Sequence, residues 1–156
     1  MDADTGREVA SRRARSRPLL LLWSPDGSRL LGVGRDTIDV RTAALALVQA
    51  QVLQHGTIAA AAWAPRGRRY AFVVHDARRD RSAVVVQGEA ETPFQGTGRV
   101  DGLVWSPDGR WLLLAWRTAD EWVFAPAGGG ERIRAVGSIS AQFHSASFPR
   151  LAGWCC

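Results

Sequence analysis

Few residues in this sequence have the types and spacing that catalysis or metal binding requires. The three histidines, His55, His75 and His144, form no metal-spaced pair, and no His-Glu-x-x-His motif is present. The Gly-x-Ser-x-Gly motif of many hydrolases is also missing. The sequence therefore predicts no catalytic, cofactor-binding or metal-binding residue, and it favours a protein that is not an enzyme.

The two cysteines, Cys155 and Cys156, are adjacent at the end of the sequence. Zinc sites usually combine a wider cysteine spacing with two further ligands, and a disulfide between neighbouring residues requires strained geometry. We therefore expect free or intermolecular thiols. Two cysteines leave the redox compartment open.

A five-residue turn motif occurs three times. The copies begin at Trp23, Trp63 and Trp105, which are 40 and 42 residues apart, and read Trp-Ser-Pro-Asp-Gly, Trp-Ala-Pro-Arg-Gly and Trp-Ser-Pro-Asp-Gly. Ser-Pro-Asp-Gly fits a type I turn at every position, and the apolar runs on both sides indicate a β-hairpin. The second copy has Arg66 in place of the aspartate, which favours Asp26 and Asp108 as turn formers rather than ligands of a shared metal.

These hairpins recur with the period of a four-stranded propeller blade. With their flanking apolar strands, they resemble the WD-repeat-like propeller units of the TolB family and, in addition, the propeller domains of prolyl-oligopeptidase-type enzymes. The resemblance covers about residues 18–126. It implies a toroid of blades whose loops bind other proteins or cover an active site held elsewhere. It also leans towards the bacterial periplasm or cell envelope.

We predict an all-β propeller with about three and a half blades of four antiparallel strands. The blades are expected at about residues 18–55, 58–96 and 99–137. Their expected strands are 19–23, 29–33, 37–41 and 48–53, then 58–63, 70–75, 83–87 and 92–95, then 100–105, 111–116, 121–126 and 132–136. The stretch 43–53 is rich in Ala, Leu and Gln, so a short helix is an equal alternative there.

Both ends of the sequence depart from the repeat. Residues 1–17 are interpreted either as the outer strand of a preceding blade or as a flexible tail, and the apolar run after their arginines is too short for a signal peptide. Residues 138–156 are expected to contain a further inner strand at 148–154. Closed propellers have four to eight blades, so we expect an incomplete ring, a fragment, or self-association that closes the ring.

The formal net charge is +5, and all 20 basic residues are arginine. Residues 66–81 form a basic cluster, which could meet an acidic partner or nucleic acid. No aromatic stacking platform accompanies the cluster, so we expect a solvated rim and no nucleic-acid partner. No apolar run reaches the 18 residues of a membrane span.

The best candidate site follows from the expected topology. In a propeller, the loops between second and third strands lie on the same face as the links between blades, and loops on a rigid scaffold commonly carry recognition. The candidate partner-binding residues are therefore Arg35, Asp36, Asp76, Arg78, Arg79, Arg81, Arg117 and Asp120. The alternative is that these charges pair with one another and only keep the surface solvated.

These observations favour a non-enzymatic scaffold that binds a protein partner and has no cofactor. The alternative is the propeller portion of a prolyl-oligopeptidase-like hydrolase that lacks its catalytic domain, or a truncated remnant. A nucleophile elbow in further sequence would favour the hydrolase.

Overall fold

The computed structural model of the protein describes residues 11, 18–129 and 132–154. The first antiparallel sheet has the strand order β1-β2-β3-β4, with β1 (Leu20–Trp23), β2 (Arg29–Val33), β3 (Thr37–Thr42) and β4 (Leu47–Val52). The second has the order β5-β6-β7-β8, with β5 (Thr57–Trp63), β6 (Tyr70–Asp76), β7 (Arg81–Val86) and β8 (Phe94–Thr97). The third has the order β9-β10-β11-β12, with β9 (Val100–Trp105), β10 (Trp111–Trp116), β11 (Glu121–Pro126) and β12 (Arg134–Val136).

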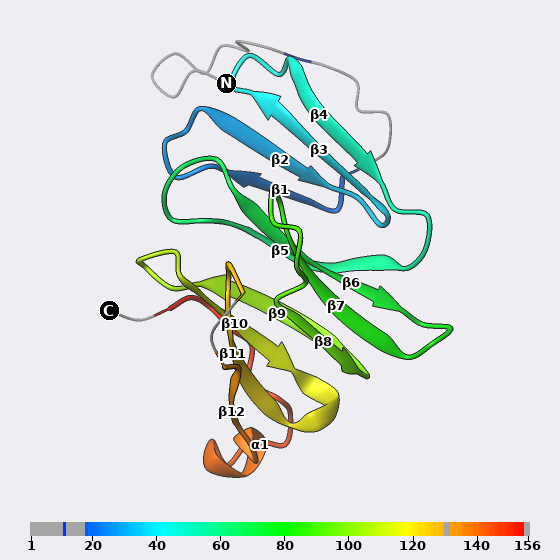
Figure 1. Ribbon diagram of the computed structural model, residues 1–156, viewed down its shortest axis with the longest axis vertical. Coiled ribbons are helices and arrows are strands. Elements are labelled where there is room, and N and C mark those ends of the chain that lie inside the picture. The colour runs from blue at the N-terminus through cyan, green and yellow to red at the C-terminus, as the bar shows by residue number, and fades with distance from the viewer. Residues whose placement is uncertain (1–10, 12–17, 130–131, 155–156) are drawn as a thin grey trace.

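The three sheets are successive blades of a β-propeller, which confirms the predicted fold class. They follow one another along the long axis of the molecule, from the blue and cyan first sheet to the yellow and orange third sheet (Figure 1). The first strand of each sheet lies beside the first strand of the next, as expected for strands nearest a propeller axis. Three blades are fewer than the four to eight of a closed ring.

The fourth strand of the first blade resolves the alternative left open by the sequence. Leu47–Val52 pairs with Thr37–Thr42 as a strand, although its composition also suits a helix. The exposed edge of β3 offers backbone partners along the whole segment, and tertiary context of this kind routinely overrides intrinsic propensity.

The hydrophobic core lies between blades rather than inside any one of them. Leu31, Ile38 and Val40 of the first blade pack against Tyr70 and Phe72 of the second. A second cluster joins the second blade to the third, and its fully buried members include Val73, Val84, Val100, Leu112 and Leu114. A strand that is apolar on both faces, such as β10, is therefore covered by a neighbour on each side.

Two of the repeated tryptophans, Trp63 and Trp105, hydrogen-bond to the preceding blade. Trp63 Nε1 donates a hydrogen bond of 2.9 Å to the carbonyl oxygen of Leu22. Trp105 Nε1 donates in the same way to Ala62, at 3.2 Å. In both cases the acceptor directly precedes the tryptophan of the previous blade. Trp23 differs, because its side chain is 55% exposed.

The Ser-Pro-Asp-Gly turns are held by a local hydrogen-bond network. Ser24 Oγ donates to Asp26 Oδ1 at 2.6 Å and accepts from the backbone N–H of Arg29 at 2.9 Å. Ser106 and Asp108 repeat this arrangement in the third blade. The glycine of every turn has a positive φ, between 67° and 74°, which an L side chain adopts with strain.

These hydrogen bonds are expected to lower the pKa of Asp26, and a titration can measure the shift. The hydroxyl of Ser24, followed by the backbone and hydroxyl of Ser28, lowers the pKa of Asp26 from 3.8 to about 2. Ionised Asp26 therefore stabilises the fold above about pH 4, and this contribution is lost as the pH falls towards 2. Ser24→Ala should raise the pKa of Asp26 towards 3.8 in a carboxyl NMR titration. An unchanged pKa would show that Ser24 is not the main cause, and Ser106→Ala is the control that should leave Asp26 unaffected.

The segment after β12 corrects one expectation. No strand forms at 148–154; instead, a short helix, α1 (Ile139–Gln142), and the chain that follows it lie over the outer face of the third blade. Ile139 and Phe148 are buried there against Ala115, with Trp122 and Leu151 beside them. Residues 148–154 pair with none of the described strands. Phe148 and Leu151 pack instead on the apolar outer face of the third blade, and this burial removes their side chains from water. Ring closure by a second copy stays a prediction, and it would require this segment to leave.

Two further findings concern the ends and the helices. The interpretation of residues 1–17 as an outer strand or tail, and the state of Cys155 and Cys156, lie outside the described residues, apart from Ser11. Among the residues that are described, no helix is long and apolar enough to cross a membrane.

Candidate protein-binding face

The loops between second and third strands lie on one face of the blades together with the links between blades. Backbone N–H groups of the links donate to these loops: Leu53 to Asp36 O at 2.8 Å, Gly98 to Asp80 O at 2.6 Å and Ile139 to Asp120 O at 3.2 Å. In Figure 1 this face is at the right, whereas the Ser-Pro-Asp-Gly turns are at the left. Each loop is thus tied to the segment that leads out of its own blade, which makes the loop face a continuous surface. We call it the loop face and define it by the eight predicted residues.

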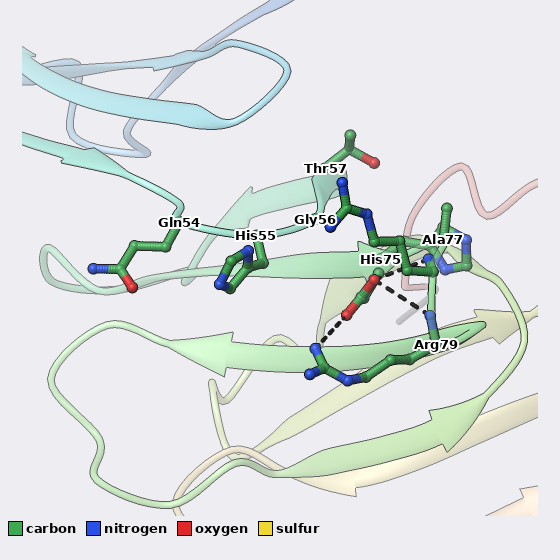
Figure 2. Close-up of a pocket in the computed structure, with 9 residues that line it drawn as sticks. Gln54, His55, Gly56, Thr57, His75, Ala77 and Arg79 are labelled. Atoms are coloured by element: carbon green, nitrogen blue, oxygen red, sulfur yellow. Dashed lines mark hydrogen bonds and ion pairs between the residues drawn. The ribbon is translucent and has the colours of Figure 1, made fainter.

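A hollow of the loop face lies beside the link between the first and second blades. Its volume is about 500 Å³, and it is lined by the β4–β5 link and by the β6–β7 loop with the end of β6. Figure 2 shows Gln54 and His55 on the link, opposite Ala77 and Arg79 on the loop. The sequence analysis missed the link residues 54–57, because their composition carries no motif. The signal that could have found them is Gly56, placed between two blades.

Gly56 sets the path of the link beside the hollow. Its φ is +84°, and a Cβ built on it would lie 2.9 Å from the carbonyl oxygen of His75. Only glycine combines this backbone conformation with so close an approach to β6. The hollow therefore depends on one residue that has no side chain.

Three of the predicted residues, Asp76, Arg79 and Arg117, form ion pairs within the protein. Asp76 Oδ2 accepts a hydrogen bond of 2.9 Å from Arg79 Nη1, and Asp76 Oδ1 accepts one from the backbone of Arg78 at 2.9 Å. The bond from the Arg79 side chain is the main reason why the pKa of Asp76 lies below its usual value. Arg117 pairs with Asp101 at 3.3 Å. Exposed pairs of this kind contribute little to stability, because water and salt screen the charges, and they mainly orient the side chains.

Asp120 has a structural partner. Its Oδ1 accepts hydrogen bonds from the backbone N–H of Ser140 at 2.9 Å and from Ser140 Oγ at 2.7 Å. Asp120 itself has a positive φ of 56° and ends the short 3-10 turn Arg117–Ala119. Its carboxylate therefore anchors the segment that carries α1 and faces the protein rather than a partner.

The remaining predicted residues keep their side chains available. Arg35, Asp36, Arg78 and Arg81 are exposed, and their side chains form no hydrogen bond or ion pair with other residues of the described chain. Three of these four are cationic. Within the described residues, the loop face therefore presents three guanidinium groups without a side-chain partner, and that of Arg78 lines the hollow.

The three histidines lie at two places in the structure. His55 and His75 both line the hollow, and His75 Nδ1 lies 3.2 Å from Ser82 Oγ. His144 is exposed and follows α1. Across residues 18–129 and 132–154, no three His, Cys, Asp or Glu side chains come together in a way that could hold a metal ion.

The comparisons with known proteins define the class of fold. No protein-family model matches the chain, and no curated protein matches it in sequence. Among solved structures, it is similar to a β-propeller domain from Myceliophteria thermophila, at 12% identity and a TM-score of 0.55, over 76% of this chain and 40% of that one.

Two further structures share the fold. One is a chain of a mitotic checkpoint complex, at 17% identity and a TM-score of 0.52, with 69% of this chain and 36% of that chain covered. The other is hydrazine synthase from Kuenenia stuttgartiensis, at 16% identity and a TM-score of 0.56, with 70% and 40% covered. This protein thus spans well under half the length of these chains. Similarity at this level of identity shows a propeller-type fold, which enzymes and components of protein assemblies share.

Proposed function

We propose that this protein is a non-enzymatic, TolB-like propeller scaffold that binds a protein partner through the loop face. The observation that carries the proposal is the set of exposed arginines, Arg35, Arg78 and Arg81, which have no side-chain partner in the described structure and lie on rigid loops. Arginine is common among the residues that dominate binding energy at interfaces. The three Trp-x-Pro-x-Gly hairpins support the TolB-like part of the proposal.

The positive charge of the exposed arginines on the loop face favours a negatively charged partner. Asp76 and Asp120 are satisfied within the protein, so Asp36 is the one predicted acid whose carboxylate makes no bond in the described chain. The exposed arginines therefore favour an acidic segment, which would receive bidentate hydrogen bonds from guanidinium groups. Long-range attraction between opposite charges would also speed association.

The test uses a labelled polyglutamate peptide and the 156-residue chain in a fluorescence anisotropy titration at low salt. The double variant Arg78→Ala/Arg81→Ala should weaken binding about 2- to 30-fold, as two charge contacts of about 0.2–1 kcal/mol each would give. Arg66→Ala/Arg68→Ala removes the same charge from exposed positions on the opposite face, so it is the matched control.

The outcome separates a specific surface from bulk charge. If the loop-face variant weakens binding and the control does not, the loop face is the binding surface. Equal loss in both double variants would mean that net charge alone attracts the peptide. In that case, or if the wild-type chain does not bind, the proposal is wrong.

The hydrolase alternative stays a prediction. It would require a catalytic domain on a further segment or on another chain.

A further inference from the structure

The two ends of the blade stack have opposite properties. The outer face of the third blade is covered by residues 138–154, which we call the end cap; its apolar contacts reach Ala115 and Trp122, and the Phe124 and Trp154 rings meet edge to face at 5.7 Å. The outer face of the first blade carries Leu19, Leu21 and Trp23, which are 74%, 56% and 55% exposed. Large apolar side chains that are exposed together mark an interaction surface.

Strand geometry places these side chains on one face. Leu22 points towards the second blade, where it packs with the cluster around Leu31 and Phe72. Because successive side chains of a strand alternate, Leu21 and Trp23 point the other way. A hollow of about 170 Å³ lies beside them, lined in part by Leu21, Leu30 and Leu45.

The same face carries a charge pair that buried blade junctions lack. Leu21 is paired across the sheet with Gly32, and Gly32 with Asp39. The equivalent row of the third blade is Leu103, Leu114 and Val123, which is entirely apolar and buried.

In the first blade, Asp39 receives a hydrogen bond of 2.7 Å from Arg41 Nε. A Cβ at Gly32 would collide with the Asp39 carboxylate, so the absence of a side chain makes room for the pair. This face is therefore apolar along β1, and it carries one acid and one base, Asp39 and Arg41, along β3.

We propose that this face, which we call the β1 face, docks onto the β1 face of a second copy of the chain. A surface that holds one acid beside one base can be complementary to itself, because a two-fold axis that passes between Asp39 and Arg41 places each of them opposite the other residue of the second copy. Trp23 would gain the burial that Trp63 and Trp105 have at the blade junctions within the chain. Within the described part of the chain, the end cap covers the other end of the stack, so the pairing uses the same face on both copies and closes at two.

Sedimentation equilibrium of the 156-residue chain tests the proposal. The expected species is a dimer, twice the 17.0 kDa of one chain, with no larger species as concentration rises. Leu21→Arg should weaken the dimer roughly 30-fold or more, as expected for a charge placed at the centre of an interface. Ile133→Arg changes an apolar residue that is 47% exposed and outside the β1 face, so it is the matched control and should leave the dimer intact.

A third variant distinguishes this dimer from a ring closed head to tail. Phe124→Arg changes the outer face of the third blade, which a ring would use and the proposed dimer does not. It should leave the dimer intact, with circular dichroism confirming that every variant is folded. A monomeric wild-type chain, a ladder of larger species, a dimer that survives Leu21→Arg, or a folded Phe124→Arg variant that is monomeric would each overturn the proposal. Because these readouts are masses of the chain alone, they are independent of the binding test for the loop face.

Discussion

Replacing Leu114 with alanine is expected to lower the free energy of unfolding by about 2–5 kcal/mol. Leu114 has no exposed surface and lies in the cluster that joins the second and third blades. The truncation removes three buried carbon atoms and leaves a cavity that packed sheets on both sides prevent from collapsing. Since small domains are stable by only about 5–15 kcal/mol, this loss is a large part of the total.

Urea denaturation followed by tryptophan fluorescence measures this effect. Ile133→Ala is the control, because its side chain is 47% exposed and a surface change of this kind stays within about 0.5 kcal/mol. If Leu114→Ala unfolds at the same urea concentration as the wild-type chain, the second and third blades do not share the packed junction described above.

Replacing Gly56 with alanine should be nearly as damaging, for a different reason. Alanine at positive φ costs about 1–2 kcal/mol. At Gly56 the new Cβ would also lie 2.8 Å from Val74 Cγ1 and 2.9 Å from the His75 carbonyl oxygen, and the backbone atom cannot move aside. Forced overpacking of this kind adds about 1–3 kcal/mol.

Gly88→Ala separates the two contributions. Gly88 has a similar φ of +89°, but a Cβ there would have no atom within 4 Å. The difference in unfolding free energy between the two variants therefore measures the steric contact alone. Equal losses in Gly56→Ala and Gly88→Ala would show that the link has room to shift, and that the hollow beside it is more adaptable than its geometry indicates.

For the loop face, the sequence predicted the position of the charged loops but not the pairing of their charges. Repeat topology was enough to place charged loops on one face, because the order of strands in a blade decides which connections share an edge. Which charges are paired depends on neighbours that are distant in sequence, such as Asp101 for Arg117 and Ser140 for Asp120. The roles of these residues in binding stay predictions.

The end cap shows the same limit for the fold. Residues 148–154 have an apolar composition that suits a strand, and the sequence predicted one. The same apolar side chains can also be buried against the face of a sheet that is already formed, and a local pattern does not show that such a face lies nearby. Phe148 and Leu151 pack on the outer face of the third blade in this way.

The sequence by itself determined the hairpins, the period and the propeller class, because turn chemistry and strand alternation act over a few residues and are repeated three times. The tertiary structure decided that residues 47–52 form a strand rather than a helix, which arginines remain unpaired, and which end of the stack is covered. Each of these outcomes depends on what lies opposite a segment once the sheets have stacked. Whether a side chain is buried or paired depends on its own segment and on the segment opposite it, and a local sequence pattern describes only the first of these two segments.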